Sequence, residues 1–163
     1  MSNILVVGKP NSGKSLLFNR LTGVSQKVSN FPGVTVEIKS ATFRKHNLID
    51  FPGTYSLDPL TKDEKVAVDK FNGYISSKTV KGVLCMLDST RLERSLVFAL
   101  QAQKLALESG VPVMFALNMM DDVERIGESI DVEGLERDLT SKVFPISTRQ
   151  GKGLEALSNG LDD

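Results

Sequence analysis

The chain has 163 residues, of which 40% are apolar and 25% are charged, a balance typical of one soluble globular domain. Lysines and arginines equal aspartates and glutamates in number, and this zero net charge argues against a broadly basic surface that binds nucleic acid. The single cysteine, Cys85, excludes an internal disulfide, and its place in an apolar run predicts a buried thiol. The longest apolar run, at residues 111–117, is far below the ~20 residues that cross a bilayer, so we expect this chain alone to be soluble.

Strand and helix patterns alternate along the chain. Short apolar runs predict strands at residues 4–7, 48–49, 83–87, 111–117 and 143–146, and alternation of apolar and polar residues predicts a half-exposed edge strand at 36–43. Apolar residues at helical spacing predict helices at residues 15–21, 63–75, 92–108, 132–139 and 153–161. Residues 24–35 are rich in Ser, Asn, Pro and Gly, which favours a mobile loop. The order predicts an α/β fold in one domain, residues 1–163: an about six-stranded, mostly parallel sheet with one antiparallel edge strand, and helices on both faces.

The first motif is G-K-P-N-S-G-K-S at residues 8–15, between the first predicted strand and the first predicted helix. It matches the phosphate-binding loop pattern G-x-x-x-x-G-K-[ST]. Gly8 and Gly13 let the backbone turn tightly, so that consecutive N–H groups and the helix N-terminus face an anion. Lys14 supplies a charge for the outer phosphates, and Ser15 supplies a hydroxyl for Mg²⁺.

Two further segments would complete the phosphate and metal site. D-F-P-G at residues 50–53 follows a predicted strand; there Asp50 can hold Mg²⁺ through a water, and the Gly53 N–H can sense the γ-phosphate. Thr35 ends the loop that precedes strand 36–43, where nucleotide-dependent switch loops carry a threonine for Mg²⁺ and the γ-phosphate.

The base is predicted to bind at N-M-M-D, residues 118–121, after the strand 111–117. A carboxylate at Asp121 can accept both the ring N–H and the exocyclic NH₂ of guanine, which adenine does not offer as a pair. Asn118 would tie this loop to the phosphate loop, and Met119 would cover one face of the base. Backbone N–H groups of the segment 147–149 would reach the guanine carbonyl oxygen.

These elements in this order resemble a small GTPase domain, and nearly the whole chain resembles the N-terminal G domain of FeoB ferrous-iron transporters. The matching segments are residues 8–15, N-F-P-G-V-T-V-E at 30–37, D-F-P-G-T-Y-S-L at 50–57, D-S-T-R-L-E-R at 88–94, N-M-M-D at 118–121 and S-T-R-Q-G-K-G at 147–153. Thr148 stands where this family more often has alanine.

The resemblance implies a P-loop GTPase switch that regulates ferrous iron uptake at the cytoplasmic face of the bacterial inner membrane. Its expected partners are a membrane-embedded iron-transport domain of the same polypeptide and small accessory transport proteins, with no nucleic acid. The family usually has a helical segment after the G domain that slows GDP release, and we expect neither that segment nor the membrane domain in this chain.

The resemblance also implies how hydrolysis proceeds. Asn11 matches the asparagine that coordinates K⁺ in potassium-activated relatives, and this K⁺ would supply transition-state charge. Thr54 stands where Ras-like enzymes have a glutamine that orients water, so we expect slow hydrolysis with water held by the backbone of residues 33–35. The only histidine, His46, is predicted to lie in a solvated hairpin turn, and no iron site is predicted.

The predicted residues can be collected by role. The catalytic set is Lys14, Asn11, Thr35 and Gly53. The metal ligands are Ser15, Thr35 and, through water, Asp50 for Mg²⁺, with Asn11 for K⁺. The residues expected to bind GTP or GDP are Gly8, Asn11, Ser12, Gly13, Lys14, Ser15, Leu16, Gly33, Val34, Thr35, Asp50, Pro52, Gly53, Asn118, Met119, Asp121, Ser147, Thr148 and Arg149.

Two alternative functions fit part of the same pattern. The first is a GTPase of the tRNA-modification or ribosome-assembly type, which shares P-N-x-G-K-S; the zero net charge and N-M-M-D speak against it. The second is a nucleotide-sensing interaction module, in which hydrolysis is incidental and the loops 24–35 and 53–64 recruit a partner in the GTP state.

Overall fold

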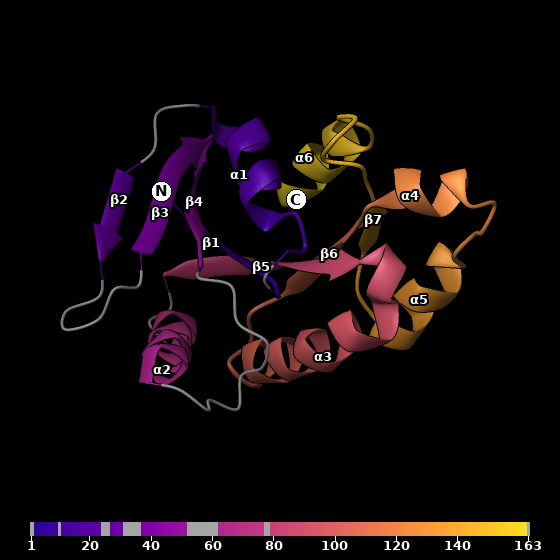
Figure 1. Ribbon diagram of the computed structural model, residues 1–163. Helices are drawn as coiled ribbons and strands as arrows, with labels where there is room; N and C mark the ends of the chain where they lie inside the picture. The colour runs from indigo at the N-terminus through magenta and orange to yellow at the C-terminus, as the bar shows by residue number, and fades with distance from the viewer. Residues whose placement is uncertain are drawn as a thin grey trace.

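A computed structural model describes residues 2–9, 11–23, 27–30, 37–51, 62–76 and 79–162 of the chain. Within these residues, the strands form one seven-stranded sheet with the order β2-β3-β4-β1-β5-β6-β7 (Figure 1). The strands are β1 (Ser2–Val7), β2 (Lys27–Asn30), β3 (Glu37–Phe43), β4 (His46–Asp50), β5 (Val80–Asp88), β6 (Val113–Asn118) and β7 (Val143–Pro145). The helices are α1 (Lys14–Thr22), α2 (Lys62–Ser76), the short 3₁₀ helix η1 (Ser89–Arg91), α3 (Leu92–Glu108), α4 (Met120–Arg125), α5 (Val132–Leu139) and α6 (Leu154–Asp162).

The sheet is mostly parallel, as predicted. β1 pairs in parallel with β4 and β5, and the parallel series continues through β6 to β7. β3 pairs antiparallel with both β2 and β4, so among the described strands β3 alone runs against the others. The predicted fold class, an α/β sheet with one antiparallel strand and helices on both faces, is confirmed.

The position of the antiparallel strand differs from the prediction. β3 was expected at the edge, but β2 lies outside it, with a register that runs from Lys27↔Ser40 to Asn30↔Glu37. This pairing satisfies the backbone groups that an edge strand would leave open. β2 falls inside the segment predicted as a loop, because its sequence, K-V-S-N, has no apolar alternation that would indicate a strand.

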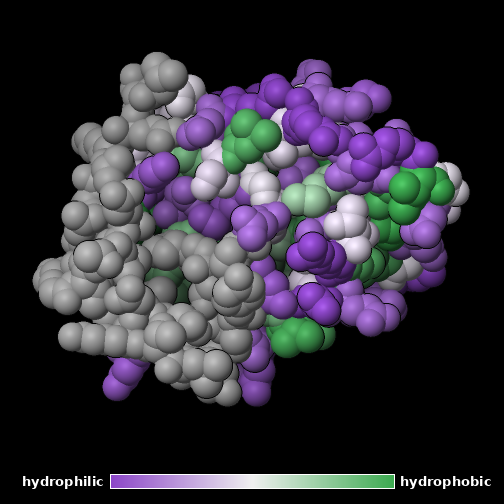
Figure 2. All heavy atoms as spheres, in the orientation of Figure 1, coloured by the Kyte–Doolittle hydropathy of each residue, from purple (hydrophilic) through white to green (hydrophobic). Residues whose placement is uncertain are grey.

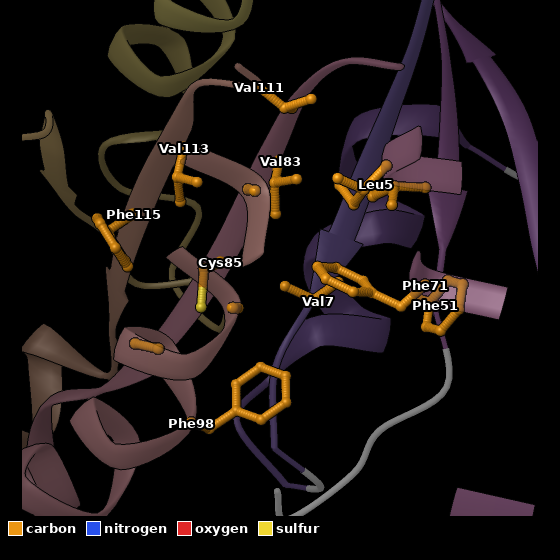
Figure 3. Close-up of a cluster of buried hydrophobic side chains, with 14 of the residues drawn as sticks. Leu5, Val7, Phe51, Phe71, Val83, Cys85, Phe98, Val111, Val113 and Phe115 are labelled. Carbon is orange, nitrogen blue, oxygen red and sulfur yellow. The ribbon is translucent and has the colours of Figure 1, made fainter. Parts of the chain in front are cut away.

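One face of the sheet packs against α2, α3 and α5. Leu5 and Val7 of β1 lie in one cluster with Phe71 of α2 and Phe98 of α3, all at most 2% exposed (Figure 3). Cys85 of β5 lies in the same cluster and is fully buried, and this burial raises the pKa of its thiol to about 12. The prediction of a buried thiol is therefore confirmed.

The opposite face packs against α1 and α6. Ile4 and Val6 alternate with the residues of the first cluster along β1, and they contribute to a second cluster with Leu17 of α1 and Leu157 of α6. Both faces of the central strands are thus covered, which explains why their sequences read as continuous apolar runs.

His46 is not the solvated turn residue that was predicted. The turn consists of Arg44 and Lys45, so His46 opens β4 and points inward, with 1% of its surface exposed. Its Nε2 lies 3.3 Å from Oδ1 of Asp162 in α6. Burial lowers the pKa of His46, the charges of Lys81 and Lys45 lower it further, and the carboxylate of Asp162 opposes the shift.

None of the described helices is both long enough and apolar enough to cross a bilayer. On the part of the surface that Figure 2 shows in colour, hydrophobic side chains lie scattered among hydrophilic ones.

Candidate nucleotide site

The loop after β1 passes close to the parallel strands β5 and β6. A side chain at Gly8 would place its Cβ 2.9 Å from both the Cβ of Met86 in β5 and the Oγ of Ser12. Gly13 has a φ of 88°, and a Cβ there would fall on the side-chain amide of Asn118. Both glycines are therefore required by the close approach of the loop backbone to its neighbours.

The loop ends in the N-terminus of α1, and the described residues around it suit an anion. Gly13 is the N-cap and no side chain caps the helix, and the first turn contains no acidic residue. The Oγ of Ser12 is buried, with no hydrogen-bond partner among the described residues. A helix N-terminus carries partial positive charge, and phosphate oxygens would satisfy both the backbone N–H groups and this hydroxyl.

A buried ion pair joins the loop to β4. The Nζ of Lys14 contacts Oδ1 of Asp50, and the two side chains are only 9% and 7% exposed. Asp50 is in register with Val6 of β1, so the two parallel strands bring the cation and the carboxylate together at one end of the sheet. This arrangement suits a lysine that binds phosphate oxygens and a carboxylate that holds a hydrated Mg²⁺.

Asn118 connects the phosphate loop with two other loops of the site. Its Nδ2 donates to the carbonyl oxygen of Ser12 at 3.0 Å and to Oγ1 of Thr148 at 3.2 Å. Its Oδ1 accepts from the backbone N–H of Thr148 at 3.0 Å. The side chain is 1% exposed, so both amide donors and the carbonyl are used inside the protein. The predicted tie between the base loop and the phosphate loop is present in the structure.

Asp121 lies in the first turn of α4. The N-cap of this helix is Met119, whose φ of 64° is uncommon for a residue other than glycine. Burial raises the pKa of the Asp121 carboxyl, but hydrogen bonds from Arg149 and Ser147 and the charge of Arg149 outweigh it, so its pKa lies below the usual value. The carboxylate therefore stays ionised, as an acceptor of two donors from a base must be.

The predicted site residues fall into two groups. Those that the structure brings together around the ends of β1, β4 and β6 are Gly8, Asn11, Ser12, Gly13, Lys14, Ser15, Leu16, Asp50, Asn118, Met119, Asp121, Ser147, Thr148 and Arg149. Gly33, Val34, Thr35, Pro52 and Gly53 lie outside the described residues.

One contact was not predicted. Sequence reasoning gave Arg149 a role through its backbone only, yet its guanidinium binds the carboxylate of Asp121 and also that of Asp122. The two aspartates and the arginine are 27 and 28 residues apart, and no local pattern links them.

A phosphate loop between β1 and α1, an acidic residue at the end of β4, and an asparagine that ends β6 with an aspartate in the following helix α4 define this chain as a domain of the P-loop GTPase fold. A family model described as "Ferrous iron transport protein B" matches residues 2–161. The chain therefore belongs to the ferrous iron transport protein B (FeoB) family.

Individual relatives agree with this result. The Fe(2+) transporter FeoB of Salmonella typhimurium is 40% identical over 165 residues, which cover 96% of this chain and 20% of that protein. A crystal structure of an S. thermophilus NFeoB mutant bound to mGDP has 38% identity and a TM-score of 0.85, covering 98% of this chain and 59% of that one. The G domain of T. maritima FeoB has 36% identity and a TM-score of 0.84, covering 99% of this chain and 97% of that one. The chain thus spans about a fifth of the length of the curated relatives it matches.

Proposed function

We propose that the chain is a GTP-binding and slowly GTP-hydrolysing switch domain that regulates ferrous iron uptake and is stimulated by K⁺. The observation that carries this proposal is the Asn118 network, because it fixes the Ser12 backbone and the Thr148 backbone to the loop that carries Asp121. A phosphate cradle and a base-recognising carboxylate are thereby held at a defined separation, which is what a nucleotide requires.

Asp121 selects guanine in this proposal. Its two oxygens accept the N1–H and the 2-amino group of the base, while adenine would leave the buried carboxylate without that donor pair. The S. thermophilus relative bound to mGDP supports a guanine nucleotide as the ligand.

Lys14, Ser15 and Asp50 would hold the phosphates and Mg²⁺. Lys14 binds the outer phosphate oxygens, the Ser15 hydroxyl at the start of α1 is a direct metal ligand, and Asp50 holds the metal through a water. When bound, Mg²⁺ neutralises charge on the β- and γ-phosphates. Thr35 and Gly53, which would meet the γ-phosphate, belong to the predictions that lie outside the described residues.

Asn11 is the proposed K⁺ ligand. It has a φ of 66° and an exposed side chain beside the start of α1, so its amide oxygen is available to a cation next to the phosphates. The position after Gly53 is Thr54, not the glutamine that orients water in Ras-like enzymes, and a cation bound at Asn11 would accelerate hydrolysis by stabilising transition-state charge.

The wider role follows from the family. Since the curated relatives are about five times as long as this chain, we propose that residues 1–163 act as one G domain, attached to a membrane-embedded iron-transport domain of the same polypeptide. The domain would work at the cytoplasmic face of the bacterial inner membrane, with small accessory transport proteins as further partners.

Two measurements test the proposal. Phosphate release from GTP is compared in K⁺ and in Na⁺ at equal ionic strength, for the original chain and for Asn11→Ala. The control is Asn72→Ala, which changes an exposed asparagine of α2. We expect stimulation by K⁺ that Asn11→Ala abolishes and Asn72→Ala retains. Equal rates in the two salts would refute the K⁺ site.

Base recognition is tested separately by the competition of GDP and ADP against a fluorescent guanine nucleotide. The original chain should prefer GDP strongly, and Asp121→Ala should lose most of that preference. An unchanged preference in Asp121→Ala would contradict the assignment of this carboxylate.

A further inference from the structure

The guanidinium of Arg149 lies on the carboxylate that the proposed function assigns to the base. Its Nε donates to Oδ2 of Asp121 at 3.1 Å, and its Nη2 donates to the same oxygen and to Oδ1 of Asp122, the latter at 2.9 Å. Both bonds to Asp121 therefore use the same carboxylate oxygen, Oδ2.

The exposure of the two partners is very unequal. The side chain of Asp121 is 5% exposed, while that of Arg149 is 65% exposed. The main chain beneath the arginine is held, because Nη2 of Arg20 donates to the carbonyl oxygen of Arg149 at 2.9 Å. An arginine side chain can thus swing away from Asp121 into solvent while its loop stays in place.

Guanine needs the oxygen that the arginine uses. Its two donors, N1–H and the 2-amino group, take one carboxylate oxygen each, whereas the bonds of Arg149 are concentrated on Oδ2. Asp122 is 25% exposed and accepts from the same Nη2, so a displaced arginine keeps one anionic partner.

We propose that Arg149 competes with the guanine base for the carboxylate of Asp121 and thereby sets the rate at which the nucleotide leaves the site. This proposal rests on the proposed function, since it takes Asp121 as the acceptor of the base. The arginine replaces the departing base as the partner of the buried carboxylate, so that nucleotide release does not leave this charge unpaired.

The first test measures the dissociation of fluorescent mant-GDP by chase with unlabelled GDP. We expect Arg149→Gln and Arg149→Ala to slow dissociation about two- to fivefold, the range that partly exposed ion pairs reach. Arg125→Ala is the matched control: Arg125 is 69% exposed and its Nη2 contacts Oδ1 of Asp122 at 3.0 Å, so its ion pair is with Asp122 rather than with Asp121. This control should leave the dissociation rate unchanged, and thermal unfolding curves confirm that all three variants are folded.

A second test separates competition from a general effect on the loop. Inosine lacks the 2-amino group, so IDP offers one donor to Asp121 and needs only one carboxylate oxygen. Competition therefore predicts that Arg149→Gln raises the affinity for GDP more than that for IDP. A loop that merely moves would change both affinities by the same factor.

The failure of this proposal is distinct from failure of the proposed function. If the original chain does not bind mant-GDP, or if Asp121→Ala keeps its preference for guanine, the function itself is wrong. If those two results are as expected but Arg149→Gln releases GDP at the original rate or faster, competition by Arg149 is overturned. Equal effects on GDP and IDP also overturn it.

Discussion

Replacing Asn118 by alanine removes three hydrogen bonds from the centre of the site at once. The backbone carbonyl of Ser12 loses its side-chain donor, and the N–H and hydroxyl of Thr148 both lose their partner. Because the side chain is 1% exposed, these groups are left in a buried place, where each lost bond costs about 0.5–1.5 kcal/mol. The sum predicts a loss of unfolding free energy of about 2–4 kcal/mol, with a fall in Tm on the order of 5–15 °C for a domain of this size.

Asn47 provides the matched control. Its Nδ2 makes one bond, to Oδ1 of Asn3 at 3.2 Å, and the pair is only partly buried. Asn47→Ala should therefore cost less than about 1 kcal/mol. Urea unfolding of both variants measures the difference, and mant-GDP titration should show a large loss of affinity for Asn118→Ala alone. If the two variants lose equal stability, Asn118 does not couple the loops and the reasoning fails.

Two further predictions concern the phosphate loop and the buried histidine. Gly13→Ala should abolish nucleotide binding and lower Tm, because the added Cβ would fall on the side chain of Asn118. Gly23 is the control, because its φ of 77° is similar but an added Cβ would have no atom within 4 Å. Gly23→Ala should therefore cost only the conformational strain of about 1–2 kcal/mol. The pKa of His46 is lowered in the folded state, so the unfolded chain binds a proton more readily, and stability should fall as pH drops below about 6.5. His46→Gln should reduce this loss between pH 7.5 and pH 5.5 in urea unfolding, and an identical pH profile for both proteins would contradict the role of the histidine.

The sequence predicts best where its signals are local. The phosphate loop, the apolar central strands and the long helices follow from spacing within about ten residues, and all of them are present in the structure. α4 has six residues, too few for a helical period to show, and it was not predicted. β2 was missed because pairing with β3, rather than its own residues, makes it a strand.

The other differences come from tertiary contacts. His46 is buried because the turn ends at Lys45 and His46 already belongs to β4, whereas the strand was predicted to begin only at residue 48. The guanidinium of Arg149 reaches Asp121 only because β6 and β7 lie side by side and place their following loops together. Neither contact leaves a periodic pattern, so a single sequence does not reveal it.

The site thus combines a buried, fully bonded residue, Asn118, with an exposed one, Arg149, which follows the Thr148 that Asn118 binds. Asn118 is buried, uses all its hydrogen-bonding groups and joins the three loops of the site. Arg149 is mostly exposed, and its side chain bonds to two carboxylates, one of which, Asp121, is the proposed acceptor of the base. Changes to Asn118 should alter folding stability together with affinity for every guanine nucleotide. Changes to Arg149 should alter release and cost less folding stability than Asn118→Ala, because the guanidinium itself is 65% exposed. Measuring folding stability and the rate of nucleotide release on the same variants therefore separates the structural role of Asn118 from the proposed role of Arg149 in release.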